Sequence, residues 1–291
     1  MTARAPGQPP DGRLRQAAAI PPTTGADVPP LSVQELVVRF GGLTAVDRVS
    51  FTVRPGTVHA LIGPNGAGKS SCFNAITGIY RAAAGRVMLG ERDLTRTPAH
   101  RMAGLGIGRA FQNLALSPRS TVLDNVLLGR HALGRGGFLA TGLRLPWVVR
   151  GERRHAARAA EICDFLGIAR HLHRPAGGLP YGDQKRVDIA RALAVEPTVL
   201  MLDEPAAGMN AAETAEMART IRDVRDALGI SVLLVEHDMG LVMGIADRVT
   251  VLDFGRLIAD DTPQAVQRDP EVIRAYLGAD DESSSREEGP A

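Results

Sequence analysis

The feature that most constrains the fold is a glycine-rich segment at residues 63–70, which reads Gly-Pro-Asn-Gly-Ala-Gly-Lys-Ser. It matches the phosphate-binding loop pattern of Gly, four residues, Gly, Lys and Ser or Thr. Residues 58–62 before it form a short apolar run that predicts a buried strand, and residues 70–77 predict the start of a helix. Glycines let successive N–H groups point at phosphate oxygens, beside the positive end of the helix dipole. The segment therefore predicts a nucleoside triphosphate as ligand.

Two side chains of this loop have separate predicted roles. Lys69 is expected to reach the β- and γ-phosphates, and the Ser70 hydroxyl is expected to bind Mg²⁺. Lys69 and Lys185 are the only two lysines among 34 basic residues. A compact ammonium suits a narrow loop better than a planar guanidinium does. The predicted nucleotide-binding residues of the loop are Gly63, Pro64, Asn65, Gly66, Ala67, Gly68, Lys69, Ser70 and Ser71.

Composition excludes several other classes of protein. A net charge of +2 and an aromatic content of 4% argue against nucleic-acid binding. The two cysteines, Cys72 and Cys163, fall in predicted helices and allow neither a disulfide framework nor a zinc site. No apolar stretch reaches the ~18–20 residues of a membrane helix, and the patch at residues 17–20 is too short for a signal peptide. We expect a cytosolic chain that serves a membrane only through partners.

The chain divides into a folded domain at residues 31–278 and two tails that we expect to be disordered. The tail at residues 1–30 is rich in proline, and the tail at residues 279–291 is acidic and serine-rich. Within the domain, residues up to about 111 favour short β-strands, and residues from about 113 to 180 favour helices. The predicted strands of the first part are 36–40, 49–53, 58–62 and 86–89.

From residue 183 onward, predicted helices alternate with buried strands. The predicted strands are 199–203, 232–235 and 248–252. Such alternation predicts a parallel sheet flanked by helices. The predicted fold class is therefore α/β. It is a P-loop NTPase core with a mostly parallel sheet and an antiparallel β-rich part, interrupted by an inserted α-helical subdomain.

Two strands of this predicted sheet end in ionisable side chains. Asp203 and Glu204 follow the buried run 199–202, and two acids at a buried strand end would be costly as structure alone. At the carboxyl edge of a parallel sheet, Asp203 is expected to hold Mg²⁺ through water. Glu204 would then polarise the water that attacks the γ-phosphate. His237 follows the strand 231–235 and would sense the γ-phosphate at the same edge.

Two further elements complete the predicted site. Gln112 lies at the junction between the β-rich part and the helical insertion, where it could contact Mg²⁺ or water and report its state. A second glycine-containing segment leads into a helix that ends near residue 194, and its start would form another anion site. That segment consists of Leu179, Pro180, Tyr181, Gly182 and Asp183.

In the order loop, Gln, signature segment, Asp-Glu strand and His, these elements resemble the ATP-binding cassette (ABC) ATPases over roughly residues 31–278. The resemblance implies a dimer that hydrolyses two ATP molecules, each held between one subunit's loop and the other's signature segment 179–183. Phe40 would then stack on adenine. Hydrolysis would open the dimer and move attached membrane domains.

A finer resemblance is to the longer ATPase subunit of branched-chain amino-acid importers. It is carried by residues 40–46, 109–113, 203–210, 236–243 and 275–278, and by an insertion at 137–149. It implies a place on the inner face of the bacterial plasma membrane and the transport of leucine, isoleucine or valine. The implied partners are two membrane permease subunits, a second ABC ATPase subunit and an extracytoplasmic solute-binding protein.

Other solutes and other classes of ABC ATPase stay open at this stage. Amides, urea or aromatic acids are alternative solutes. An exporter of lipids or lipopolysaccharide would carry a closely similar cassette. A soluble ATPase that acts on ribosomes or DNA is a third alternative, against which the single cassette, the lack of sustained heptads and the lack of a strong basic patch argue.

The signature segment departs from the family pattern Leu-Ser-Gly-Gly-Gln. Pro180 lacks the hydroxyl that would bond the opposing γ-phosphate, a contact worth about 1.5–3 kcal/mol, and it lacks an N–H. Asp183 would repel phosphate if it faced the nucleotide. Asn210 stands where the dimer contact usually ends in Asp, and Asp261 stands where Gly is usual. We therefore hypothesise a heterodimer whose two ATP sites hydrolyse unequally.

Overall fold

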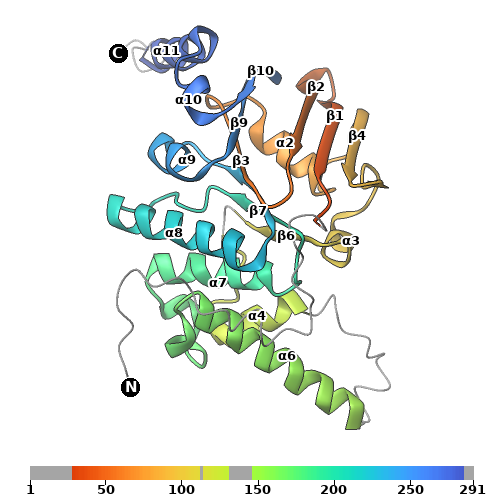
Figure 1. Cartoon of the computed structure of the whole chain (residues 1–291), viewed down its shortest axis with the longest axis vertical. Coiled ribbons are helices and arrows are strands. Elements are labelled where there is room, and N and C mark those ends of the chain that lie inside the picture. Colours follow the sequence, from red (N-terminus) through yellow and green to blue (C-terminus); the bar gives the residue numbers. More distant parts are fainter. Residues whose placement is uncertain (1–27, 112–113, 131–145, 285–291) are drawn as a thin grey trace, which may run out of the picture.

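Two β-sheets pack on opposite sides of one helix, α2 (Lys69–Ile76), in a computed structural model (Figure 1). The structure describes residues 28–111, 114–130 and 146–284. The predicted α/β class, with a mostly parallel sheet and a separate antiparallel sheet, is confirmed. Phe73 and Ile76 of α2 lie in a core cluster that takes side chains from both sheets. This sandwich fixes the start of α2, where the glycine-rich loop ends.

The larger sheet has six strands in the order β10-β9-β3-β8-β7-β6, of which only β10 is antiparallel to its neighbour. The strands are β3 (Val58–Ile62), β6 (Ile107–Ala110), β7 (Val199–Asp203), β8 (Ser231–Val235), β9 (Arg248–Asp253) and β10 (Arg256–Asp261). The predicted strands 58–62, 199–203, 232–235 and 248–252 are confirmed to within a residue, whereas β6 and β10 were not predicted. Strands β3, β7 and β8 are buried along their whole length because helices cover both faces of the sheet.

The smaller sheet is antiparallel, in the order β2-β1-β4-β5. Its strands are β1 (Leu31–Phe40), β2 (Leu43–Val53), β4 (Ala84–Leu89) and β5 (Arg92–Asp93). Strands β1 and β2 begin earlier than the predicted 36–40 and 49–53. Glu35 (φ 48°) and Arg48 (φ 52°) are left-handed and lie where the β1–β2 register shifts. Each shift breaks the two-residue alternation by which a strand is recognised in sequence.

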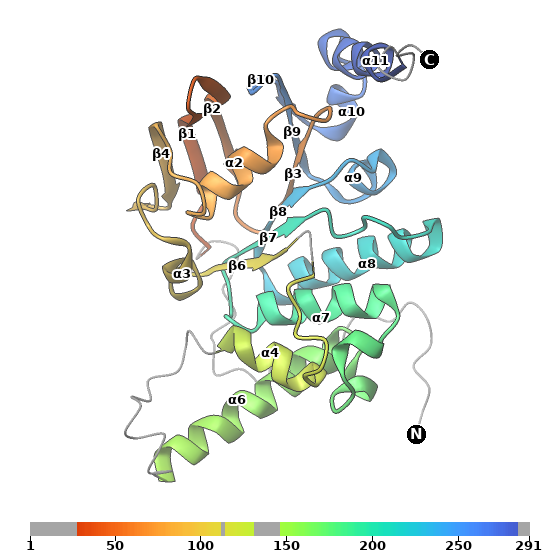
Figure 2. The same ribbon diagram turned by 180° about the vertical axis from the view of Figure 1, so that it is seen from behind.

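In the described part of the chain between β6 and β7, three helices pack together below the large sheet (Figure 2). They are α4 (Val122–Arg130), α6 (Pro146–Phe165) and α7 (Tyr181–Leu193), with the 3₁₀ turns η3 (Ala169–His171) and η4 (Ala176–Gly178) before α7. Val126, Ile162 and Val187 are buried where these helices meet. Since α7 also contacts β6, the helical part is joined directly to the sheet.

The remaining helices cover the sheet and its ends. They are α3 (Ala99–Met102) with the 3₁₀ turn η1 (Ala103–Leu105), α8 (Ala211–Leu228), α9 (Met239–Ile245), α10 (Pro263–Val266) and α11 (Pro270–Ser284). Helix α11 runs past residue 279, where the acidic tail was expected to begin, because extending an existing helix by a turn costs little. Among the described residues, no helix has the length and apolar character to cross a membrane.

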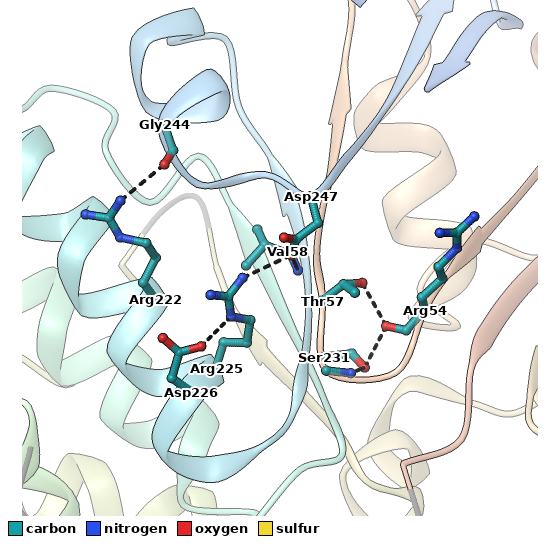
Figure 3. Close-up of polar contacts among 10 residues, drawn as sticks. Arg54, Thr57, Val58, Arg222, Arg225, Asp226, Ser231, Gly244 and Asp247 are labelled. Carbon is teal, nitrogen blue, oxygen red and sulfur yellow. Dashed lines mark hydrogen bonds and ion pairs between the residues drawn. The ribbon is translucent and has the colours of Figure 1, made fainter. Parts of the chain in front are cut away.

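The large sheet carries different side chains along its carboxyl edge, where the parallel strands end, and along its amino edge, where they begin. Strands β3, β7 and β8 run parallel, so their carboxyl ends lie at one edge, which carries the predicted site. At the opposite edge, backbone and side chains close a polar network (Figure 3). There Asp247 Oδ2 accepts from Val58 N at 2.8 Å and lies 3.0 Å from Arg225 Nη1. The amino ends of the strands are thereby tied to α8, which is a structural role.

Candidate functional site

The phosphate-binding loop joins β3 to α2, at the position that its sequence predicts. Gly63, Gly66 and Gly68 have φ values of 147°, 81° and 96°. A Cβ on Gly63 would lie 2.1 Å from the carbonyl oxygen of Leu252, so this turn admits only glycine. No acidic residue lies in the first turn of α2, and its N-terminus is therefore suited to an anion.

Lys69 lies inside the loop. Its Nζ donates to the carbonyl oxygens of Gly63 (2.6 Å) and Pro64 (2.8 Å), and the residue is 8% exposed. Burial lowers the pKa of Lys69, and the nearby Glu204 carboxylate opposes that shift. The ammonium thus lies at the loop and within electrostatic reach of the predicted catalytic acid. Asn65, Gly66 and Ser70 of the same loop are exposed.

Asp203 and Glu204 end β7 at the same edge. Asp203 is 6% exposed, and its Oδ1 has no hydrogen-bond partner among the residues that the structure describes. Burial raises the pKa of Asp203, while the charge of Arg109 lowers it. Glu204 has a left-handed backbone (φ 48°), and its N–H donates to the carbonyl oxygen of Val235 at 2.8 Å. A strained backbone at a strand end is typical of a functional position.

Arg109 is a site residue to which the sequence assigned no role. Its Nη2 lies 3.4 Å from Asp203 Oδ2 and donates to Asn74 Oδ1 at 2.7 Å. The guanidinium also lies over the rings of Phe73 and Phe111, at 4.8 and 5.0 Å from their centroids. Arg109 therefore holds α2 against the end of β7. Its place beside the predicted Gln112 junction was the only signal in the sequence.

His237 follows β8 and its side chain is 61% exposed, near the carboxyl edge of the sheet. The residue before it, Glu236, is 1% exposed and was not predicted as part of the site. Glu236 Oε1 accepts from Ala206 N at 2.9 Å, and Oε2 accepts from His237 N at 3.0 Å. Glu236 thus ties the loop after Glu204 to the loop that carries His237.

The signature segment begins α7. Pro180 is the N-cap residue, with φ −53° and ψ 148°, and its carbonyl oxygen accepts from Gln184 N at 3.0 Å. Tyr181 is 44% exposed, whereas Leu179 is buried. The N-cap geometry accommodates proline without strain, because proline fixes φ near −65°. The segment therefore presents an exposed helix start that has no side-chain cap.

Asp183 does not face solvent at this helix start. It is 7% exposed, and its carboxylate lies 3.0 Å from Arg186 Nη1 and 3.3 Å from His171 Nε2. Arg170 Nη2 lies 3.7 Å away. The negative charge is thus paired inside the helical part, between α7 and η3. The repulsion of phosphate that the sequence raised as a concern does not follow from this geometry.

The two other departures from the family pattern have local partners. Asn210 is the N-cap of α8: its Oδ1 accepts from the N–H groups of Ala212 and Glu213, and Glu213 accepts from Asn210 N in return. This reciprocal capping box stabilises the helix start. Asp261 is exposed and its Oδ1 accepts from Thr262 N at 2.6 Å.

Phe40 and Gln112 are the two remaining predicted residues, and the structure describes only Phe40. Phe40 ends β1, is 45% exposed and contacts Tyr80 edge to face, with ring centroids 5.0 Å apart. Gln112 lies outside the described residues, as does most of the predicted insertion at 137–149. Its neighbour Phe111 donates its N–H to Asp188 Oδ2 of α7 at 2.8 Å. The junction is therefore connected to the signature helix.

Comparison with known families places two separate matches on the chain. Residues 46–207 match the family model described as ABC transporter, and these residues include the loop, the signature segment and the Asp-Glu strand end. Residues 256–282 match the model described as branched-chain amino acid ATP-binding cassette transporter. The second match spans β10, α10 and most of α11.

Individual proteins similar to this chain have descriptions that agree with both family models. The high-affinity branched-chain amino acid transport ATP-binding protein LivG of Salmonella typhimurium is 43% identical over 250 residues, 86% of this chain and 98% of that protein. BraF of Pseudomonas aeruginosa, which carries the same description, is 41% identical with the same coverage. A crystal structure of the ADP conformation of MJ1267, an ATP-binding cassette of an ABC transporter, superposes with a TM-score of 0.75 at 32% identity. The superposition covers 85% of this chain and 98% of that one.

Proposed function

This chain belongs to the ABC transporter family, and we propose that it is the ATP-hydrolysing subunit of a bacterial importer for branched-chain amino acids. The match of residues 256–282 to the branched-chain model is the observation that supports the solute class. The relatives LivG and BraF, which are described as branched-chain amino acid transport ATP-binding proteins, support the same solute class. The catalytic edge itself carries no information on the solute, because the solute need not touch this subunit.

ATP binding uses the loop and the exposed aromatic residue beside it. The backbone N–H groups of the loop residues other than Pro64, together with the start of α2, would bind the phosphates, with Lys69 on the β- and γ-phosphates. Phe40, exposed at the end of β1, would stack on adenine. The signature segment 179–183, in which Pro180 and Tyr181 are exposed, would receive the γ-phosphate of the ATP that a partner subunit binds.

Hydrolysis requires a group that accepts a proton from water near the γ-phosphate. Glu204 would serve as this base, since it follows β7 and lies within electrostatic reach of Lys69. His237, exposed after β8, would contact the γ-phosphate and help to orient the water. Glu236 sets the spacing of the two loops that carry these side chains. The products are ADP and phosphate.

The residues at this edge fit a magnesium ion bound together with ATP. The described residues contain no cluster of three or more His, Cys, Asp and Glu side chains that would enclose a metal by themselves. Asp203 Oδ1 is buried without a hydrogen-bond partner in the described part of the chain, and Ser70 is exposed at the loop. Mg²⁺ commonly takes one or two protein oxygens plus substrate phosphates and water, and it neutralises phosphate charge. Ser70, Asp203 and Gln112 would therefore be its protein contacts, Asp203 through water.

An exposed apolar patch supports a permease as partner. Ile79, Phe111 and Leu128 are 46%, 37% and 59% exposed. They border a cavity of about 270 Å³ between α3, α4 and α7. Exposed apolar patches of this kind mark protein contacts, and a permease must transmit motion between the sheet and the helical part. We assign this patch to a cytoplasmic segment of a membrane permease.

The complete transporter would contain two permeases, this chain, a second ATPase subunit and an extracytoplasmic solute-binding protein. This chain would lie in the cytoplasm on the inner face of the plasma membrane. Pro180 supports a heterodimer with unequal sites, because it removes one hydroxyl contact to the ATP that the partner holds. If this is correct, Pro180→Ser raises turnover in the assembled pair. An unchanged rate would count against the asymmetry.

The deciding experiment measures ATP hydrolysis by the purified chain, alone and mixed with its second ATPase subunit, with Glu204→Gln as control. Hydrolysis that rises on mixing and falls with the control supports a heterodimeric transport ATPase. Strong hydrolysis by the chain alone would favour a homodimer. Uptake of labelled leucine by vesicles that contain the whole complex, with urea and an amide as competitors, tests the solute class.

A further inference from the structure

Lys185, the second of the two lysines in the chain, lies between the signature segment and the end of β7. It is 3% exposed, and its Nζ donates to the carbonyl oxygen of Glu204 at 3.2 Å. The same Nζ lies 5.7 Å from the centroid of the Tyr181 ring. One ammonium therefore contacts the backbone of the predicted base and a side chain of the signature segment. A cation buried to this degree is expensive unless it is matched by acceptors and charge.

The contact falls where the backbone is strained. Glu204 has φ 48°, a conformation that costs a non-glycine residue free energy unless its surroundings impose it. Three hydrogen bonds hold the backbone of Glu204: its N–H donates to the Val235 carbonyl oxygen, and its own carbonyl oxygen accepts from Ala207 N at 3.2 Å and from Lys185 Nζ. The first bond comes from the sheet, the second from the turn that follows Glu204 and the third from α7. Lys185 is the side-chain donor of the three.

The electrostatic surroundings also suit an ammonium. Burial raises the pKa of Asp203 and of Asp188, and the positive charge of Lys185 acts against both shifts. The chain uses arginine for nearly all its other cations, and Arg186 next to Lys185 forms ion pairs with Asp183 and Glu216. A guanidinium is planar and wider, whereas an ammonium on a flexible stem can meet one carbonyl and one ring face.

We propose that Lys185 is a positioning residue, which holds the backbone of Glu204 in its catalytic conformation and ties it to the signature segment of the same chain. The inference rests on the proposed function. Glu204 acts on the ATP bound by this chain, whereas Tyr181 faces the ATP bound by the partner. Lys185 thus connects the two ATP sites of the dimer through one subunit.

The test compares Lys185→Met, which keeps the length of the side chain, with Lys185→Gln, which keeps a neutral donor. Arg222→Met is the matched control, because Arg222 Nη1 donates to the carbonyl oxygen of Gly244 at the same 3.2 Å, in an exposed hydrogen bond between α8 and α9 (Figure 3). The full chain is assembled with its second ATPase subunit. The kcat, the KM for ATP and the temperature of unfolding are then measured for each variant.

A hydrogen bond from a charged donor is worth enough to change a rate roughly 10- to 100-fold. We expect Lys185→Met to lower kcat by about that factor with KM for ATP within about twofold of wild type, Lys185→Gln to be intermediate, and Arg222→Met to be unchanged. Because Lys185 acts through Glu204, Lys185→Met should not lower the residual rate further in a Glu204→Gln background.

Three results would overturn the inference: an unchanged kcat in Lys185→Met, an equal loss in Arg222→Met, or an additive loss in the Glu204→Gln background. If Lys185→Met does not fold, Lys185→Gln decides by the same criteria. Failure of the proposed function is distinguishable, because then the wild-type pair itself hydrolyses no ATP and both proposals fall together.

Discussion

Replacing Arg109 by Met should unpair a buried carboxylate at the catalytic edge. Arg109 and Asp203 have side chains that are 12% and 6% exposed, and their closest atoms lie 3.4 Å apart. Methionine keeps an apolar stem against Phe73 and Phe111 but removes the charge and the bond to Asn74. Asp203 would then remain buried without its ion-pair partner.

The expected loss follows from burial. Removing one partner of a buried ion pair lowers the free energy of unfolding by about 3–5 kcal/mol. Because the closest atoms of this pair are 3.4 Å apart, we expect a loss at the lower end, about 3 kcal/mol. For a domain of this size, the melting temperature should fall by roughly 6–12 °C. Burial already raises the pKa of Asp203, and losing Arg109 raises it further. An acid with a raised folded-state pKa costs stability while it is ionised, so the loss should be largest at neutral pH and shrink as pH falls toward that pKa.

Thermal unfolding followed by circular dichroism measures this effect. Wild type, Arg109→Met, Asp203→Asn and the double variant are compared near neutral pH and about two pH units lower. In the double variant the neutral amide needs no cation, so Arg109→Met should cost less there than in the wild-type background. The reasoning is refuted if the two single effects simply add, or if the loss in Arg109→Met does not depend on pH.

Three shorter predictions follow from other parts of the structure. Gly63→Ala should weaken ATP binding at least roughly 10-fold in a calorimetric titration, because its Cβ would lie 2.1 Å from the Leu252 carbonyl oxygen at φ 147°. Asp183→Asn should lower the free energy of unfolding by about 1–3 kcal/mol in urea, since the charge paired with Arg186 is lost; no change would mean that the pairing is unimportant. Burial lowers the pKa of His59 from 6.5 to about 4, so between these two pH values the imidazole is protonated in the unfolded chain but neutral in the folded chain. The free energy of unfolding should therefore fall by roughly 3 kcal/mol as the pH drops from 6.5 to about 4. His59→Gln should remove this pH dependence in urea titrations at several pH values.

Four strands of the large sheet, β3, β7, β8 and β9, could be predicted from the sequence, whereas β6 and β10 were not predicted. Strands β3, β7 and β8 are covered on both faces, so each is a continuous apolar run bounded by turn residues or charges. The small sheet was predicted only in part. Bulges at Glu35 and Arg48 change which residues face the core, and no local pattern marks where such a bulge occurs.

The site residues that the sequence missed share one property. Arg109, Lys185 and Glu236 each act through a partner that is distant in sequence or lies on another element. Their residue types are unremarkable in isolation, since arginine is abundant in this chain and a lone acid or lysine usually lies on the surface. The predicted roles of the loop, Glu204 and His237 await the measurements above.

By itself the sequence determined the phosphate-binding loop and the strands that lead to it, because the steric demands of a tight turn and of a doubly covered strand act on neighbouring residues. Only the tertiary structure decided which charges are neutralised. Asp183 turns into the helical part toward Arg186, and Asp203 meets Arg109 across the sheet edge. Ion pairing in a buried place depends on distance in space and on solvent exclusion, and both are set by how the elements pack rather than by their order in the chain.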